Sequence, residues 1–375
     1  MTDGFGLDHL PYGVYSVAAG APRVGVRYAD TVLDVAKVRP ELDRPSLNDF
    51  MALGPDAWAD TRAEIAQLAE AGGLPETALA DARLYLPFTV GDYVDFYASL
   101  DHASNVGRIF RPDQEPLLPN WKHLPVGYHG RGGTVVVSGT DVIRPCGQRK
   151  TPSDDAPTYG PSQRLDIEAE LGFVVGVGTE LGERIGVGDF ADHVFGVVGL
   201  NDWSARDIQA WEYVPLGPFL GKSFATSVSA WVTPLAALAA ARVPLPTQDP
   251  QPLPYLTGGH AIDLEAEVVL NGDVVSRPPY RTMYWSPAQM LAHLTVNGAS
   301  TRPGDLFASG TISGPVPAER GSFLELSWGG QEPMAGGRTF LEDGDEVTLR
   351  YSAPGTAGGR ITLGEVTGRI VPARP

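Results

Sequence analysis

The sequence has little cysteine, little positive charge and no long hydrophobic run. Its 375 residues include 28 lysines and arginines against 45 aspartates and glutamates, which gives a formal net charge of −17. A surface this acidic repels phosphate backbones, so we expect no nucleic-acid partner. Cys146 is the only cysteine, so an internal disulfide is excluded and a reducing, cytoplasmic location is expected. No apolar stretch approaches the ~20 residues that span a bilayer, so we expect no membrane partner.

Glycine and proline are abundant, with 45 and 33 residues, which favours many turns and short strands over long helices. The length suits two domains, or one large β-rich domain with an appendage. Residues 1–88 carry little candidate chemistry; His9 is interpreted there as a surface or cap residue, and residues 55–71 are predicted to form a helix. We therefore expect a mainly β (α+β) protein with a small N-terminal domain at 1–88 and a larger domain at 89–375.

A polar stretch at residues 201–222 follows a buried-strand pattern. Ser204 and Asp207 resemble a capping box, which predicts the start of a short helix. One face of that helix carries Arg206, Gln209 and Tyr213. The carboxylate of Asp202 precedes the helix, and Lys222 follows it. This arrangement suits a site that binds a cation beside an anionic substrate, although a solvated helix with a surface salt bridge gives the same pattern.

Four carboxylates stand beside strongly apolar or aromatic segments. Residues 165–175 alternate with period two, so Glu168 and Glu170 share one face of a predicted strand. Asp95 and Asp202 complete the set. Ligation by oxygen alone indicates a hard cation, Mg²⁺ or Ca²⁺, while the alternative for the two glutamates is a solvent-facing strand edge.

His102 is placed on a predicted helix at the edge of its apolar face. A lone histidine there is usually a packed core residue, but Asp95, Tyr97 and Arg111 lie nearby in the sequence, so a catalytic role stays equally open. Glu325 lies among leucine and tryptophan in residues 322–328, which we interpret as a strand. An acid among apolar neighbours usually pairs with another group.

The most distinctive blocks of the sequence are Asp95-Phe-Tyr97, His102-Ala-Ser-Asn-Val-Gly107, residues 119–131, Glu168-Ala-Glu170, residues 201–222 and residues 309–315. Through these blocks the chain resembles the fumarylacetoacetase family from about residue 86 to the C-terminus. The resemblance implies a small SH3-like β-barrel at 1–88, a mixed β-roll catalytic domain at 89–375 and a homodimer. It also implies a metal-dependent hydrolase of a small-molecule substrate, 4-fumarylacetoacetate, at the end of tyrosine and phenylalanine catabolism.

The resemblance further implies a role for each site residue. The residues implied to hold the metal, Ca²⁺ and/or Mg²⁺, are Asp95, Glu168, Glu170 and Asp202, with Lys222 and Thr226 near a second cation. His102 would activate water and Glu325 would orient it. Those implied to hold the oxyanion are Arg206, Gln209 and Lys222. Those implied to bind the substrate are Tyr97, Arg111, Tyr128, Gln209, Tyr213 and Thr311.

Two alternatives remain at this stage. A related acylpyruvate hydrolase or oxaloacetate decarboxylase of the same superfamily would be expected to lack the block at residues 211–218. A non-catalytic, metal-stabilised binding protein would be expected to lack His102 or Glu325, and both are present.

Overall fold

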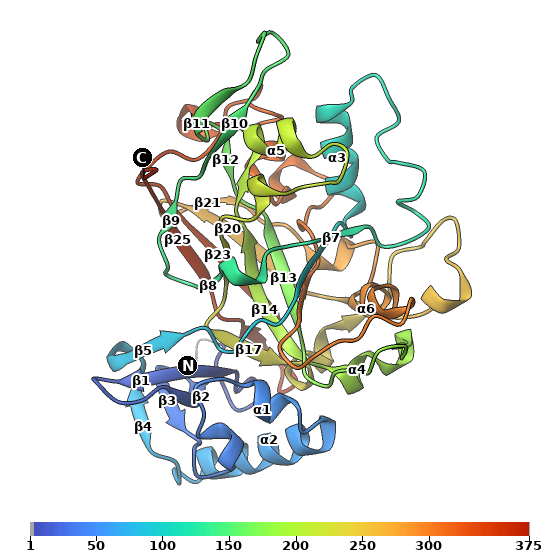
Figure 1. Cartoon of the computed structure of the whole chain (residues 1–375). Coiled ribbons are helices and arrows are strands. Elements are labelled where there is room, and N and C mark those ends of the chain that lie inside the picture. Colours follow the sequence, from blue (N-terminus) through green and yellow to red (C-terminus); the bar gives the residue numbers. More distant parts are fainter. Residues whose placement is uncertain (1–3, 375) are drawn as a thin grey trace.

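The computed structural model describes residues 4–374, a mixed α/β fold dominated by two β-sheets with short helices around them (Figure 1). The larger sheet has 13 strands, and its main path runs β4-β3-β2-β1-β17-β14-β13-β22-β6-β7. In path order these strands are Glu76–Ala78, Thr31–Asp34, Arg23–Tyr28, Tyr12–Val17, Trp231–Pro234, Val194–Asp202, Ala169–Val175, Leu306–Ala308, Tyr93–Phe96 and Gly127–His129. Off this path, β5 (Ala82–Tyr85) pairs with β1, while β16 (Thr226–Val228) joins β14 to β8 (Val135–Val137).

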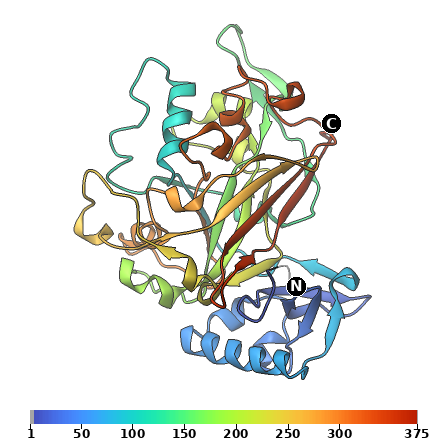
Figure 2. The same ribbon diagram turned by 180° about the vertical axis from the view of Figure 1, so that it is seen from behind.

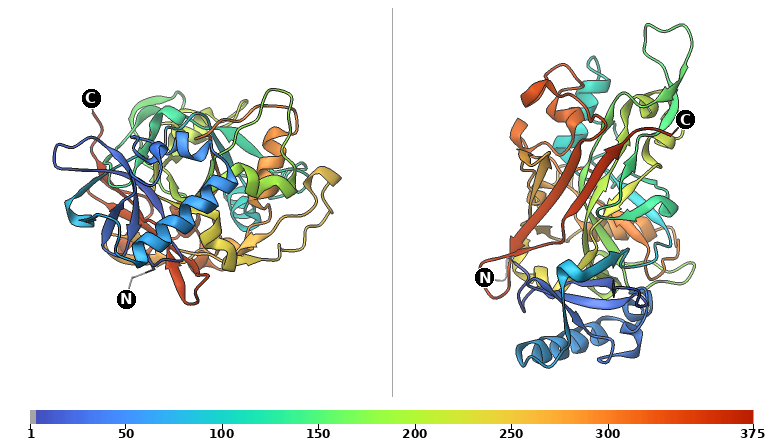
Figure 3. Two further views of the ribbon diagram at one scale, coloured as in Figure 1. Left: turned by 90° about the horizontal axis from the view of Figure 1, so that it is seen from below. Right: turned by 90° about the vertical axis from the view of Figure 1, so that its left-hand side faces the viewer.

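The smaller sheet has six strands in the order β21-β20-β23-β25-β9, with β24 beside β23. These strands are Asp273–Ser276, Glu265–Leu270, Glu346–Pro354, Val366–Val371, Val142–Ile143 and, for β24, Arg360–Thr362. Figure 3 shows β23 and β25 as the long red strands on one side of the molecule. The remaining strands form two-stranded pairs, β10 (Cys146–Arg149) with β11 (Thr158–Pro161), β12 (Leu165–Asp166) with β15 (Ser204–Ala205), and β18 (Arg242–Val243) with β19 (Ala261–Ile262).

The α-helices are short, apart from α2 and α3. They are α1 (Asn48–Met51), α2 (Pro55–Glu70), α3 (Leu100–Phe110), α4 (Phe190–His193), α5 (Arg206–Glu212), α6 (Pro287–Thr295) and α7 (Phe323–Leu326). The helix predicted at 55–71 is confirmed as α2, with Pro55 in its first turn. Gly72, which follows it, has a φ of +64°, a conformation that glycine adopts without a steric penalty.

The N-terminal strands and α2 lie at one end of the molecule (Figures 1 and 2). Strand β1 pairs with β2 and β5, and it also pairs with β17 of the larger part at Tyr12↔Val232. The rings of Tyr12 and Phe50 pack on Phe195 of β14, with centroids 5.5 and 5.8 Å apart. Both the sheet and the hydrophobic core therefore continue from the N-terminal residues into the rest of the chain.

The interpretation of His9 as a surface or cap residue is wrong, because its side chain is fully buried. Its Nδ1 donates to the carbonyl oxygen of Gly4 at 3.1 Å, and its Nε2 accepts from the Thr233 hydroxyl of β17 at 2.9 Å. Arg62 on α2 also donates to the His9 carbonyl oxygen. The histidine thus joins three segments at the contact between the N-terminal residues and the large sheet.

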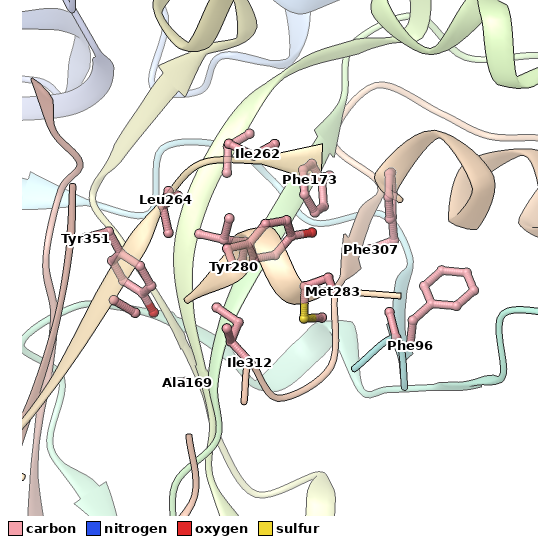
Figure 4. Close-up of a cluster of buried hydrophobic side chains, with 14 of the residues drawn as sticks. Phe96, Ala169, Phe173, Ile262, Leu264, Tyr280, Met283, Phe307, Ile312 and Tyr351 are labelled. Carbon is pink, nitrogen blue, oxygen red and sulfur yellow. The ribbon is translucent and has the colours of Figure 1, made fainter. Parts of the chain in front are cut away.

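The main core lies between the two sheets and is rich in aromatic side chains (Figure 4). Phe173 of β13 and Phe307 of β22 stack with their ring centroids 5.2 Å apart. Every residue of β13 is buried, so both of its faces are covered by protein. The predicted strand at 165–175 is interrupted at Ile167 and Glu168, because β12 pairs with β15 whereas β13 pairs with β14.

Two local predictions are wrong. Ser204 belongs to strand β15, and α5 begins at Arg206 without a side-chain cap; Asp207 instead accepts hydrogen bonds from Ser162 Oγ and the Gln163 amide. Residues 322–328 contain helix α7, not a strand. The helix forms because the Ser322 hydroxyl accepts a hydrogen bond from the Glu325 amide, which is an N-cap contact.

Candidate active site

A cavity of about 370 Å³ opens between α3, the end of β6, strand β7 and helix α5. It collects most of the side chains that the sequence singled out. The predicted site residues that line it are Asp95, Tyr97, His102, Arg111, Tyr128, Glu168, Arg206, Gln209, Tyr213, Lys222 and Thr311. The predicted site residues that do not line it are Glu170, Asp202, Thr226 and Glu325. The size suits a small organic molecule.

His102 and Glu325 form a buried pair at one side of this cavity. Nδ1 of His102 donates to Oε2 of Glu325 at 2.6 Å. The Glu325 carboxylate also accepts from the hydroxyls of Ser313 and Ser322 and from the amide of Asn105, so all of its neighbours are donors. Burial raises the pKa of Glu325, but His102 and these donors together lower it below its usual value. An ionised Glu325 fixes the proton of a neutral His102 on Nδ1 and leaves Nε2 free to accept a proton.

His102 lies in the first turn of α3, and Glu325 lies in the short helix α7. The Ser99 hydroxyl accepts from the His102 amide at the start of α3 and donates to the carbonyl oxygen of Ser313. The ring of Tyr97 meets the imidazole edge-on, with centroids 5.3 Å apart. His102 Nε2 lies 4.0 Å from Oε1 of Glu168. The free nitrogen of the base therefore lies next to the carboxylate cluster.

The four predicted carboxylates come together as a cluster. Asp95, Glu168, Glu170 and Asp202 each offer an oxygen within 4.8 Å of the others, and all four are buried. Strands of the large sheet bring them there: Glu170 lies in β13 and Asp202 ends the adjacent β14, while Asp95 is the penultimate residue of β6, which β22 separates from β13. The alternative of a solvent-facing edge for Glu168 and Glu170 is excluded.

Cationic side chains neutralise only one side of this cluster. Lys222 Nζ bonds to Glu168 and lies 2.8 Å from Oδ2 of Asp202, while Arg206 forms an ion pair of 2.8 Å with Glu168. Burial raises the pKa of Glu168, but Lys222 and Arg206 outweigh it, and the net shift is downward. Burial and then Glu168 raise the pKa of Asp202 in spite of Lys222.

On the other side of the cluster, Asp95 and Glu170 form no ion pair with any residue in 4–374. Asp95 Oδ1 and Glu170 Oε1 are buried and accept no hydrogen bond. Burial, followed by repulsion from neighbouring carboxylates, holds the pKa of both groups well above the usual range. Buried carboxylate oxygens without donors, in a set made of oxygen ligands alone, fit a hard divalent cation. Thr226 is not part of the cluster, but its hydroxyl donates to Oδ1 of Asp202 at 3.2 Å.

Several polar groups in the cavity wall are free to meet a ligand. Thr311 Oγ1 and Arg111 Nε are buried and have no hydrogen-bond partner, while another Arg111 nitrogen donates to the Pro116 carbonyl. Tyr128 donates to Oδ2 of Asp202 at 2.9 Å, and burial and Asp202 keep its pKa well above the usual range. Arg206 donates to Gln209 Oε1, which fixes the amide nitrogen of Gln209 as the free donor.

The sequence prediction missed two polar residues next to the predicted site. Asn105 lies three residues after His102 on α3 and contacts the same glutamate. Asp166 is fully buried and binds Arg206 Nε at 2.7 Å. A signal for Asp166 existed, because Asp166, Glu168 and Glu170 continue one period-two series of acids.

Comparison with known families agrees with this geometry. Residues 93–371 match the family model described as "Fumarylacetoacetate (FAA) hydrolase C-terminal", and residues 8–87 match "Fumarylacetoacetase N-terminal". The chain belongs to the fumarylacetoacetase family.

Among curated members of the fumarylacetoacetase family, the rat protein named fumarylacetoacetase is 47% identical over 405 aligned residues, with 98% of this chain and 96% of the relative covered. The human fumarylacetoacetase is 46% identical over the same shares of both chains. The one from Arabidopsis thaliana is 42% identical and covers 99% of this chain and 96% of the relative. Alignment over nearly the whole length means that both sheets and the site residues lie within the region of similarity.

Solved structures of lower identity share the fold. A fumarylacetoacetate hydrolase from Exiguobacterium antarcticum superposes with a TM-score of 0.62 at 18% identity, covering 97% of this chain and all of its own. A maleylpyruvate hydrolase from Sphingobium sp. SYK-6, solved with manganese(II) and pyruvate, gives 0.55 at 16% identity over the same shares. At such identities the likeness shows a shared fold.

Proposed function

We propose that this protein hydrolyses a carbon–carbon bond of 4-fumarylacetoacetate and releases fumarate and acetoacetate. The observation that carries the proposal is the His102–Glu325 pair beside a buried cluster of four carboxylates, in a chain 47% identical to a curated fumarylacetoacetase. A 1,3-diketone cleaved by water needs a base near neutral pKa, an oxyanion site and a means of stabilising a carbanion. The cavity contains a candidate for each.

In this proposal His102 Nε2 removes a proton from water as the oxygen adds to the carbonyl carbon of the fumaryl group. Glu325 stabilises the imidazolium that results, because its ionised carboxylate accepts the Nδ1 proton at 2.6 Å. Asn105, Ser313 and Ser322 keep Glu325 in place through its two oxygens. The pair therefore supplies both the base and its orientation.

The tetrahedral oxyanion would be held by Arg206, Gln209 and Lys222, which converge on the cavity from α5 and the turn that follows it. Positioned donors of this kind are worth ~3 kcal/mol each to the transition state. The bond between the attacked carbon and the adjacent methylene carbon then breaks. Its electron pair leaves with the acetoacetate fragment, which takes up a proton, and fumarate keeps the oxygen from water.

Asp95, Glu168, Glu170 and Asp202 would hold Ca²⁺ or Mg²⁺, and Lys222 and Thr226 would lie near a second cation. When bound, the divalent cation would stabilise the negative charge that develops on the leaving fragment. Among residues that bind substrate, Arg111 and Tyr128 would meet its distal carboxylate. Tyr97, Gln209, Tyr213 and Thr311 would position the rest of it.

We also propose the finer features of the family for this chain. An SH3-like N-terminal domain at 1–88 is supported by the β5-β1-β2-β3-β4 strand order and the short 3₁₀ turn at Leu79–Asp81 between β4 and β5. Within the described residues no pairing joins β4 to β5, so the ring of strands is not closed. The catalytic β-roll at 89–375 agrees with the family match at 93–371.

A homodimer, a cytoplasmic location and a place at the end of tyrosine and phenylalanine catabolism complete the proposal. No helix within residues 4–374 is long and apolar enough to cross a membrane. Sedimentation at micromolar concentration tests the dimer, and a monomeric mass would contradict it.

The deciding experiment follows the loss of the ultraviolet absorbance of fumarylacetoacetate and the appearance of fumarate, with and without a chelator. We expect turnover that the chelator abolishes and added Ca²⁺ or Mg²⁺ restores. Acylpyruvates and oxaloacetate are run in parallel. Equal or higher kcat/KM for either of these would assign the chain to an acylpyruvate hydrolase or oxaloacetate decarboxylase activity instead.

A further inference from the structure

We infer that Asp166 is a positioning residue that couples Arg206 to Glu325, so that the oxyanion donor and the base are held by one buried carboxylate. The inference rests on the proposed function of the cavity and adds a residue to it. Asp166 does not line the cavity and belongs to the two-stranded β12–β15 pair behind it. Its carboxylate nevertheless contacts two separate parts of the catalytic apparatus.

Both oxygens of the Asp166 carboxylate are saturated by donors. Oδ1 accepts from the amides of Ile167 and Phe323, each at 2.7 Å. Oδ2 accepts from Arg206 Nε at 2.7 Å and from the Leu324 amide at 3.0 Å. The side chain is fully buried, so water does not compete for these positions. A fully satisfied buried carboxylate fixes its donors in direction as well as in distance.

The first consequence concerns the guanidinium of Arg206. It lies between Asp166 at Nε and Glu168 at Nη2, and Nη1 donates to Gln209 Oε1. Because Asp166 binds the Nε edge of the guanidinium, the attraction of Glu168 does not move the whole group toward the carboxylate cluster. Without the Asp166 charge, Arg206 would have Glu168 as its sole anionic partner and would turn away from the position in which it faces the cavity with Gln209.

The second consequence concerns Glu325. The amides of Phe323 and Leu324, the first two residues of α7, both point to Asp166, and Glu325 is the next residue along the chain. Glu325 reaches His102 over a bond of 2.6 Å, a length that tolerates little displacement of the backbone. Asp166 therefore fixes the position of the first turn of α7, the short helix that carries Glu325, the partner of His102.

The sequence order explains how one residue reaches both sites. Asp166 pairs with Ser204 across the β12–β15 ladder. Arg206, the first residue of α5, comes two residues after Ser204, and Glu168 comes two residues after Asp166, in the break between β12 and β13. The bend at Ile167 and Glu168, where β12 passes into β13, turns Glu168 into the carboxylate cluster while Asp166 stays behind it. The break in the predicted strand is thus the feature that separates the two acids.

The test compares Asp166→Asn with Asp345→Asn. Asp345 is an equally buried aspartate that binds an arginine, Arg338, and a backbone amide, that of Glu342, outside the cavity. Both variants remove one buried negative charge without changing size. We expect similar losses of Tm, whereas kcat for fumarylacetoacetate falls roughly 10–100-fold in Asp166→Asn alone, the range typical of outer partners that orient catalytic groups. KM is expected to change much less than kcat.

The same substitution is then made in the Arg206→Gln and Glu325→Gln proteins. A residue that acts through these partners costs less kcat once one of them is gone, so the loss should shrink in at least one of the two backgrounds. An equal loss in all three backgrounds, or a kcat within twofold of that of Asp345→Asn, overturns the inference. No turnover by the wild-type protein would instead contradict the proposed function itself.

Asp166→Glu serves if Asp166→Asn does not fold, because it keeps the buried charge and moves it by one methylene. We expect its kcat to lie between those of the wild type and Asp166→Asn, since catalytic groups must be held within about 0.5 Å of their working positions. A folded Asp166→Glu protein with wild-type kcat contradicts the inference.

Discussion

The imidazole of His102 donates a hydrogen bond of 2.6 Å from Nδ1 to Oε2 of Glu325, although the two residues are 223 positions apart in the chain. Because three further donors surround the same carboxylate, Glu325 remains ionised and the free Nε2 of His102 is directed toward the cavity. The fold therefore fixes the orientation of the His102 ring, and the ring nitrogen that carries its proton, before any ligand binds.

Replacing His102 by alanine should lower kcat by ~10² or more, because the general base is lost. Folding and binding of Ca²⁺ should be retained, since the four clustered carboxylates remain. Steady-state kinetics and calorimetric titration with Ca²⁺ measure the two properties. His293→Ala is the control, because that half-buried histidine contacts Tyr255 outside the cavity. Loss of Ca²⁺ affinity together with activity would make His102 a ligand or a structural residue.

Removal of the metal should abolish turnover and lower Tm, because Asp95 Oδ1 and Glu170 Oε1 are then buried without a hydrogen-bond donor among the described residues. The pKa values of both carboxyl groups are raised in the folded state, so the folded protein binds more protons at these groups than the unfolded chain does. Without metal, the free energy of unfolding therefore falls as the pH rises above ~4. The increase in Tm on adding Ca²⁺ should therefore be larger at about pH 8 than at about pH 5. Glu170→Gln should reduce this increase, whereas exposed Glu180→Gln should not; full activity after exhaustive chelation would refute the metal site.

Arg111→Ala should raise KM for fumarylacetoacetate by roughly 10–100-fold, which corresponds to the ~1.5–3 kcal/mol of a hydrogen bond to a charged group. The structural basis is that Arg111 Nε is buried in the cavity wall with no partner. Any residual decarboxylation of oxaloacetate should barely change, since that substrate does not reach the distal end. Arg83→Ala removes an exposed positive charge elsewhere and serves as the control. A fall in kcat at constant KM would place Arg111 in the chemistry instead.

Acid should destabilise the contact that His9 makes. Burial lowers the pKa of His9 from 6.5 to about 3, so its contribution to stability is complete above pH ~6.5 and is lost as the pH falls toward 3. Thermal melts of the wild type should therefore show Tm falling over this range. His9→Gln should flatten that part of the curve and exposed His123→Gln should leave it unchanged; a wild-type slope in His9→Gln would exclude His9 as the titrating group.

The local chemistry of the site was readable from the sequence, but its long-range pairings were not. Period-two alternation placed Glu168 and Glu170 on one face, and oxygen ligands indicated a hard cation; the structure groups them with Asp95 and Asp202. Alternation reports which residues share a face and not whether that face meets solvent, and both faces of β13 are buried. The pairing of His102 with Glu325 followed only from the family resemblance, because no local periodicity links positions so distant.

Other features depended on contacts that local patterns do not contain. His9 looked like a surface residue because its partner, Thr233, comes from a strand 224 positions later. Residues 322–328 have the apolar content of a strand, but the amides of Phe323, Leu324 and Glu325 donate hydrogen bonds to the side chains of Asp166 and Ser322, which favours a helical turn.

The ladder between β1 and β17 has a practical meaning for anyone who alters this chain. Truncation before residue 89 would leave the edge of β17 unpaired and would uncover Phe195, Val198 and Leu306, which now pack on N-terminal side chains. The shortened protein should then aggregate on expression instead of forming a smaller working enzyme. For the same reason, replacing Phe50 by a smaller residue should appear in a genetic screen as lost activity, although Phe50 does not line the cavity.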